Sequence, residues 1–329
     1  MADQEAPVFT PVSMPGRDIP PPSTISEAAR LSLSQGAAMP RRPRPSVDDT
    51  DAWHRQRAAV VTMWEKQSEP IFAKGNATLE TVELGGVTCY DCAPIGGAAP
   101  DGPVYLFIHG GAFIVGDGPY AKALGYRNAG DMGLRCISVD YRMPPDHPFP
   151  AAPEDCVAVY KALLATAQPS GIVIGGLWAG ANLAAAAALM IRDRGLPTPA
   201  GTALLSPMSD LTEAGESFRT NEDLDVVLKA GHTECNLLYA GGHDLTDPWL
   251  SPNFADFTKG FPPTLVQSGT RDLFLSNSVR LHRRMRHAGT EAELPLWKAM
   301  PHGEFMGSAR ENDEVRAEVA HFIRRVTGR

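Results

Sequence analysis

The chain has 329 residues, of which 43% are apolar and 21% charged, a composition typical of a globular protein with a sizeable core. A formal net charge of -8 at pH 7 argues against nucleic acids and anionic membranes as partners, because both are bound by clustered Lys and Arg. The basic run Arg41-Arg42-Pro43-Arg44 is too short to change this. We expect neither a signal peptide nor a membrane span, and the odd number of cysteines, five, favours a cytoplasmic protein.

The first part of the chain, residues 1–74, is predicted to form an N-terminal arm and cap helices. Residues 1–48 are rich in Pro, Ser and Arg, which indicates an extended arm with one short helix near residues 26–33. In residues 49–74 the apolar side chains recur at helical spacing. We therefore expect this second helix to lie across the core domain.

A hairpin and a series of alternating strands and helices follow. Two strands are predicted at 79–84 and 87–93, joined by a tight turn at Gly85-Gly86. Beyond them, short apolar runs predict strands at 104–108, 134–139, 171–175, 202–205, 264–267 and 293–297. Apolar stripes predict helices at 151–165, 179–194, 276–288 and 314–326. This alternation is typical of a mostly parallel sheet with crossover helices.

The predicted fold class is therefore α/β, with a central, mostly parallel sheet flanked by helices. We assign the core domain to residues 75–208 and 259–329. Between these two parts lies a long stretch, residues 209–258, of mixed helical and loop character. Structureless loops of this length are uncommon in compact domains, so we interpret it as a cap insertion.

The first segment with chemical meaning is His109-Gly110-Gly111-Ala112, directly after the predicted strand 104–108. Adjacent glycines at a strand end let backbone N–H groups approach a substrate oxygen closely, as an oxyanion hole requires. The segment taken alone is weak evidence, since any tight turn could use these glycines.

The second segment is Gly176-Leu177-Trp178-Ala179-Gly180, between the predicted strand 171–175 and a helix of small residues. Strand, sharp turn and helix are the context of the G-x-S-x-G nucleophile elbow, whose strained turn exposes the middle side chain. Here the middle residue is Trp178. Its indole is a hydrogen-bond donor with no nucleophilic oxygen, so it cannot form an acyl-enzyme.

Asp272 and His302 are the remaining candidates for catalysis. Each follows a predicted strand, and ligand sites of α/β sheets lie at the carboxyl ends of the strands. Either residue alone could be structural, as a helix cap or a buried histidine. The chain order of elbow, Asp272 and His302 is that of an α/β-hydrolase triad, with an orienting carboxylate and a general base.

Together these segments resemble the hormone-sensitive-lipase-like carboxylesterases of the α/β-hydrolase fold. The resemblance covers roughly residues 75–326. It rests on the ordered matches His109-Gly110-Gly111, Asp140-Tyr141-Arg142 with Phe149-Pro150, Gly176 to Gly180, Leu205-Ser206-Pro207, Asp247-Pro248-Trp249, Gly269 to Asp272 and Pro301-His302-Gly303.

The resemblance implies a role for each matched residue. Gly111, Ala112 and Ala179 would supply the N–H groups of the oxyanion hole, and Gly110 would allow the close approach of the substrate. Trp178 would occupy the nucleophile position, with Asp272 and His302 completing the triad. A cap built from the N-terminal segment and an insertion is also implied.

Trp178 is the serious departure from this family pattern. An elbow residue usually has positive φ, which is costly for a bulky side chain, so the tryptophan should either strain or relax the turn. Removing a triad nucleophile typically lowers kcat by on the order of a million-fold. Ser206, Ser209, Cys136 and Cys156 are interpreted as structural residues, so little or no ester hydrolysis is expected.

Three functions remain open on this pattern. The preferred one is a carboxylesterase scaffold whose serine was replaced, by engineering or by mutation. The second is a non-hydrolytic protein that binds a small molecule, comparable to the plant gibberellin receptors, with Trp178 as a stacking surface. The third is a lyase that uses His302 as a general base without a covalent step.

The expected partner is thus a small ester substrate or ligand. We expect no cofactor, and no metal, because His282 and His287 lack the i, i+4 spacing of helical metal ligands. Dimers are the commonest oligomers, so a homodimer is the assembly to consider.

Overall fold

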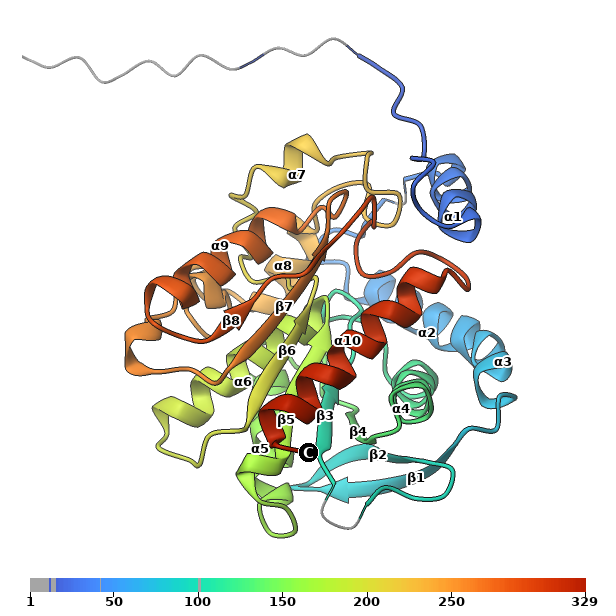
Figure 1. The fold of residues 1–329 in the computed structure, drawn as a ribbon. Helices are drawn as coiled ribbons and strands as arrows, with labels where there is room; N and C mark the ends of the chain where they lie inside the picture. The colour runs from blue at the N-terminus through green and yellow to red at the C-terminus, as the bar shows by residue number, and fades with distance from the viewer. Residues whose placement is uncertain (1–11, 13–15, 42, 100–101) are drawn as a thin grey trace, which may run out of the picture.

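The computed structural model describes residue 12 and residues 16–41, 43–99 and 102–329. Its centre is a mixed sheet in which the strand order is β1-β2-β4-β3-β5-β6-β7-β8 (Figure 1). Strand β9 also pairs with β7, nearer the carboxyl end of β7 than β8 does. The strands are β1 (Ala77–Leu84), β2 (Val87–Pro94), β3 (Val104–Ile108), β4 (Arg135–Val139), β5 (Ile172–Leu177), β6 (Gly201–Leu205), β7 (Thr264–Gly269), β8 (Ala292–Glu293) and β9 (Leu296–Trp297). Pairing is antiparallel from β1 to β2 and from β2 to β4, and parallel elsewhere.

Helices cover both faces of this sheet, as the sequence predicts. The helices are α1 (Glu27–Ala38), α2 (Thr50–Gln67), α3 (Glu69–Phe72), α4 (Pro119–Met132), α5 (Ala151–Leu163), α6 (Ala179–Asp193), α7 (Ser217–Thr220), α8 (Thr233–Ala240), α9 (Leu275–His287) and α10 (Arg310–Thr327). Side chains of α4 and α10 share one core cluster with Tyr105 and Phe107 of β3. Those of α5, α6 and α9 share the other with Leu106 and Ile108, because successive strand residues point to opposite faces.

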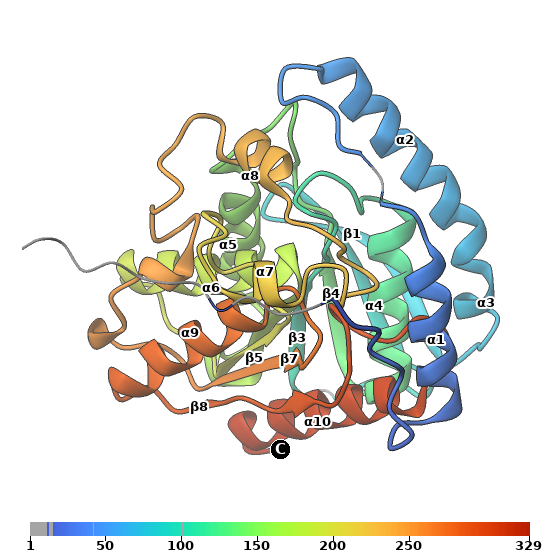
Figure 2. The same cartoon turned by 90° about the horizontal axis from the view of Figure 1, so that it is seen from above.

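The N-terminal helices lie on the side of the molecule where α4 lies (Figures 1 and 2). Helix α1 begins at an N-cap, Ser26, whose hydroxyl accepts from the Ala29 N–H and donates to Glu311 of α10. The predicted helix over residues 49–74 is two helices, because Pro70 cannot continue the backbone hydrogen bonding of α2. The short helix predicted near residues 26–33 extends to Ala38.

Two further differences from the sequence prediction are plain. The strand predicted at 293–297 is split into β8 and β9, with Pro295 between them. Helix α4 was not predicted at all. Its buried residues, which include Tyr120, Leu124 and Asn128, lie around most of its circumference, so no single apolar stripe marks it in the sequence.

Within the described residues, no helix is long and apolar enough to span a membrane. All five cysteines are unpaired and buried. Cys89 and Cys92 belong to different core clusters on the two faces of the sheet, as their spacing on a strand requires.

Candidate active site

The site is assembled at the carboxyl ends of the central strands. The loop after β3 carries Gly110 and Gly111, the turn after β5 carries Trp178, and the loops after β7 and β9 carry Asp272 and His302. The parallel pairing of β3 with β5, β5 with β6, β6 with β7 and β7 with β9 places all these loops along one edge of the sheet.

Trp178 stands in a strained turn between β5 and α6, with φ 62° and ψ -117°. A backbone hydrogen bond ties the turn to β6, since the Trp178 N–H donates to the Leu205 carbonyl at 2.8 Å. The flanking glycines permit close packing: a Cβ atom at Gly180 would lie 2.1 Å from the Ile108 carbonyl oxygen, and one at Gly176 would lie 2.4 Å from the same atom. The tryptophan therefore takes the positive φ of an elbow residue and does not relax the turn.

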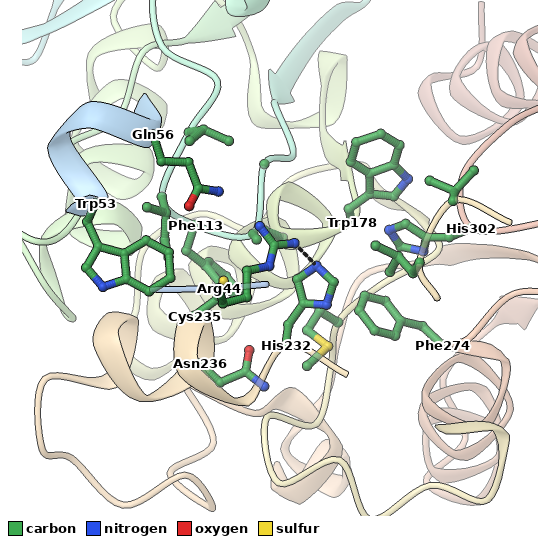
Figure 3. A pocket seen from close by; sticks show the side chains of 18 residues that line it. Arg44, Trp53, Gln56, Phe113, Trp178, His232, Cys235, Asn236, Phe274 and His302 are labelled. Atoms are coloured by element: carbon green, nitrogen blue, oxygen red, sulfur yellow. Dashed lines mark hydrogen bonds between the residues drawn. The ribbon is translucent and has the colours of Figure 1, made fainter. Parts of the chain in front are cut away.

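The indole of Trp178 fills a slot between two glycines. A Cβ atom at Gly110 would lie 2.6 Å from Trp178 Cε3, and one at Gly303 would lie 2.1 Å from Trp178 Nε1. The ring centroid lies 5.0 Å from that of His302, with 32° between the planes, and Figure 3 shows the two rings side by side. Trp178 Nε1 is buried and has no hydrogen-bond partner among the described residues. The indole thus occupies space directly beside the imidazole.

This packing predicts a strong coupling between Gly303 and Trp178. Gly303→Ala places a methyl group against the indole and forces an alanine to φ 80°, so we expect the free energy of unfolding to fall by about 2–5 kcal/mol. In a Trp178→Ser background the steric part disappears and about 1–2 kcal/mol of backbone cost remains. A double-mutant cycle followed by urea denaturation measures the difference.

Gly307→Ala is the matched control for this cycle, since Gly307 has φ 84° and nothing within 4 Å of its added Cβ. It should lose the same amount of stability in both backgrounds. Equal losses for Gly303→Ala in both backgrounds would show that the indole does not press on Gly303.

His302 and Asp272 form a buried pair. His302 Nδ1 lies 3.0 Å from Asp272 Oδ1, and both side chains are almost completely enclosed. Asp272 also accepts from the Phe274 N–H at 2.9 Å and from the Ser268 hydroxyl at 2.7 Å. Burial alone would raise the pKa of Asp272, but the His302 charge and these hydrogen bonds outweigh it and hold the pKa below its usual value. Asp272 therefore stays ionised and fixes the imidazole with Nδ1 as a donor.

A second buried carboxylate, Asp225, ties the loops of this pair together. Its Oδ2 accepts from the backbone N–H groups of Leu273, at 2.8 Å, and of His302, at 3.1 Å. Burial, followed by repulsion from Asp272, raises the pKa of Asp225 to about 6. Asp225 carries no signal of this role in the sequence, because it lies 48 residues before one of the loop residues that it binds and 77 residues before the other.

The raised pKa of Asp225 predicts a loss of stability with rising pH. Its folded carboxyl keeps a proton that the unfolded one releases between pH 3.8 and about 6. The free energy of unfolding should therefore fall, relative to an Asp225→Asn variant, by roughly 1.4 kcal/mol for each pH unit of that window. Urea denaturation of both proteins between pH 4 and 7 measures this.

Asp244→Asn is the control for this pH dependence. The backbone N–H and hydroxyl of Thr246 donate to Asp244 and lower its pKa. The native protein should therefore gain slightly on the variant between pH 4 and 5, and differ from it by a constant amount between pH 5 and 7. A constant difference for Asp225→Asn as well would contradict the predicted titration.

The glycine segment after β3 has the shape that a loop of backbone donors needs. Gly111 has φ 116°, and a Cβ atom there would lie 1.8 Å from the Val115 carbonyl oxygen, so only glycine fits. Ala112 accepts a positive φ of 54°. His109 Nδ1 donates to the Gly110 carbonyl at 2.7 Å, and its ring stacks on Tyr141. In the described part of the chain, the N–H groups of Gly111, Ala112 and Ala179 have no hydrogen-bond acceptor.

A cavity of about 160 Å³ opens beside these groups (Figure 3). Trp178, His302, Ala179 and the segment from Gly111 to Val115 form its base. The other lining residues are Arg44, Trp53 and Gln56 from the N-terminal part, Met208, Val227, Leu228, His232, Cys235 and Asn236 after β6, and Phe274. In the sequence Arg44 belongs to a short basic run, and no local pattern marks His232 as a site residue.

The other nucleophile candidates have structural surroundings. Ser206 Oγ accepts from the Gly303 N–H at 3.1 Å, and Ser209 donates to the Asn277 carbonyl. Cys136 lies in β4 and Cys156 in α5, both buried in the core. Burial raises the pKa of both thiols well above the usual value, which makes them poor nucleophiles.

Comparison with known proteins identifies the group to which this site belongs. A family model described as alpha/beta hydrolase fold matches residues 105–306. An acetyl-hydrolase of Streptomyces hygroscopicus is 32% identical over 255 residues, which are 76% of this chain and 84% of the relative. An esterase of Acinetobacter venetianus is 34% identical over 220 residues, 65% of this chain and 72% of the relative.

Solved structures agree with these relatives. The crystal structure of an esterase from the bacterial hormone-sensitive lipase family has a TM-score of 0.79 and 32% identity, and covers 92% of this chain and 99% of that one. A hormone-sensitive lipase from a metagenome library has a TM-score of 0.80 and 32% identity, with 93% of this chain and 100% of that one covered.

Proposed function

We propose that the chain is an esterase scaffold with Trp178 at the nucleophile position. The chain belongs to the hormone-sensitive lipase family of carboxylic ester hydrolases, which have the α/β-hydrolase fold. The observation that carries the proposal is the elbow geometry of Trp178, with φ 62° directly before α6 and its ring beside His302. Such a turn exposes a nucleophile in α/β-hydrolases. As it stands, the protein is expected to have little or no esterase activity.

The remaining machinery supports this proposal, each part in its own role. Asp272 holds His302 with Nδ1 as a donor, which leaves Nε2 as the general base. Gly111, Ala112 and Ala179 would offer their N–H groups to the developing oxyanion, and Gly110 keeps the approach open. A hydroxyl oxygen at position 178 is the one missing part, since an indole N–H neither attacks a carbonyl nor gives up its proton to a histidine.

The cavity lining supports a cap built from two segments. Arg44, Trp53 and Gln56 come from the proposed N-terminal arm and cap helices, residues 1–74, and Val227, Leu228, His232, Cys235 and Asn236 come from the proposed insertion, residues 209–258. The core domain of residues 75–208 and 259–329 supplies the base of the cavity. We therefore propose that the cap residues determine which esters the cavity accepts.

Binding without hydrolysis is the second candidate function. It is favoured by the indole of Trp178, which lines the cavity. Such a ring suits stacking on a flat group. Assay of short-chain esters by the native protein and by Trp178→Ser separates the two functions, because only the esterase scaffold gains activity.

A further inference from the structure

Arg44 places a positive charge in the cavity, and no carboxylate of the described residues forms an ion pair with it. It lies between α1 and α2, half-buried, and lines the cavity. Its Nη2 lies 2.7 Å from His232 Nε2, and no described carboxylate forms an ion pair with it. Arg41, three residues earlier on the same arm, pairs with Glu222 and Asp223 on the surface. The arm therefore has a paired arginine outside and an unpaired one inside.

His232 cannot supply the missing negative charge, and it remains neutral. Burial, followed by the charge of Arg44, lowers the pKa of His232 to about 3. Arginine has no acceptor atom, so Arg44 donates to Nε2 and the ring proton lies on Nδ1. That nitrogen is buried, next to the backbone of Ala230 and Gly231. The pair thus offers the remaining N–H donors of Arg44 and a positive charge, with no anion.

Glu213, the carboxylate that binds the His232 backbone, is already engaged by other donors. Its Oε1 accepts from the His232 backbone N–H at 2.6 Å and from Asn236 Nδ2 at 3.0 Å, and its Oε2 accepts from the Thr233 hydroxyl at 3.1 Å. It holds the start of α8 in place and does not pair with Arg44. A ligand can supply the anion that no described carboxylate provides to Arg44.

We propose that the cavity selects a short ligand that carries a carboxylate, with Arg44 as the anchor of that carboxylate. A guanidinium offers a planar fork that matches the two carboxylate oxygens. The remaining wall includes Ile114, Val115, Met208, Val227, Leu228 and Phe274, which suits a short hydrocarbon chain. The volume of about 160 Å³ is below the roughly 300–1,000 Å³ of sites for drug-sized ligands.

This inference rests on the proposed function, for which it names the substrate class: an ester with a free carboxylate. Figure 3 shows Arg44 and His232 between Trp53 on one side and Trp178 and His302 on the other. The carboxylate would therefore lie within the cavity and the ester group toward His302. The carboxylate can belong to the acyl part or to the alcohol part of such an ester.

Calorimetric titration of the native protein with hexanoate and with hexanamide tests the inference without any catalysis. Hexanoate should bind about tenfold to a hundredfold more tightly than hexanamide, the usual range for a hydrogen-bonded charge pair. Arg44→Met should remove this preference, with a much larger loss of affinity for hexanoate than for hexanamide. Arg55→Met, which removes an exposed charge from α2, should keep it.

Two results would overturn the inference. One is equal binding, or no binding, of hexanoate and hexanamide by the native protein. The other is a parallel loss of both affinities in Arg44→Met, since Arg44 would then only hold the arm in place.

Hydrolysis by Trp178→Ser identifies the part of the ester that carries the carboxylate. Monomethyl glutarate has it on the acyl side and 4-acetoxybutanoate on the alcohol side, and methyl pentanoate and butyl acetate are neutral counterparts. One charged ester should exceed its neutral counterpart in kcat/KM, and Arg44→Met should abolish the excess. Binding of hexanoate by the native protein together with no hydrolysis by Trp178→Ser would support the carboxylate site and refute the esterase scaffold.

Discussion

Trp178→Ser is expected to raise kcat for short-chain esters by on the order of a million-fold over the native protein, the usual loss when a triad nucleophile is missing. The new hydroxyl would stand at the top of an elbow that already has φ 62°. It would face an imidazole that Asp272 already holds at 3.0 Å. Removal of the indole would also open the slot between Gly110 and Gly303 to the substrate. Hydrolysis of p-nitrophenyl acetate and butyrate, followed at 25 °C, measures the gain.

Trp178→Ala is the matched control for this gain, because it opens the same slot without supplying an oxygen. Its kcat should stay close to that of the native protein. Circular dichroism and urea denaturation establish that both variants are folded. A folded Trp178→Ser protein that hydrolyses no ester, or a Trp178→Ala protein that is equally active, would refute the esterase scaffold.

His302→Ala in the Trp178→Ser background should remove the gained activity, with a fall in kcat on the order of a million-fold. Without the imidazole, no group next to the serine accepts its proton. Asp272→Asn should lower kcat by about 10⁴-fold, because an amide cannot hold the imidazole in the required tautomer. Assays of the double variants on the same esters measure both effects.

His321→Ala serves as the control for the histidine variant, since His321 is exposed on α10. It should keep the activity of Trp178→Ser. Retained activity in the His302 double variant would exclude His302 as the general base.

Short-range patterns in the sequence were sufficient for most of the fold. The strand predicted at 104–108 has these bounds in the structure, and the hairpin turns at Gly85-Gly86 as expected. Helix α4 was missed because its buried side chains cover most of its surface. Pro119 at its first position and Gly133 just beyond its end were the available signals, since proline favours helix starts and glycine helix ends.

The residues of the candidate site also fall into two groups, those with a local sequence signal and those without one. Trp178, Asp272 and His302 could be placed because each belongs to a local segment that follows a strand. Arg44 and His232 could not, because they are 188 residues apart in the chain and nothing near either residue in the sequence specifies their meeting. Asp225 was missed for the same reason, since its partners Leu273 and His302 lie in two other loops.

The slot between Gly110 and Gly303 has an evolutionary consequence. A serine codon and the tryptophan codon can differ at a single base, so one mutation can exchange the two residues at the elbow. The new ring meets no Cβ atom on either side, because both walls are glycine. Because neither wall carries a side chain, an ester could reach a nucleophile in this slot. For the same reason an indole fits there without breaking the turn. A mutation that removes the nucleophile at this position can thus leave the fold intact.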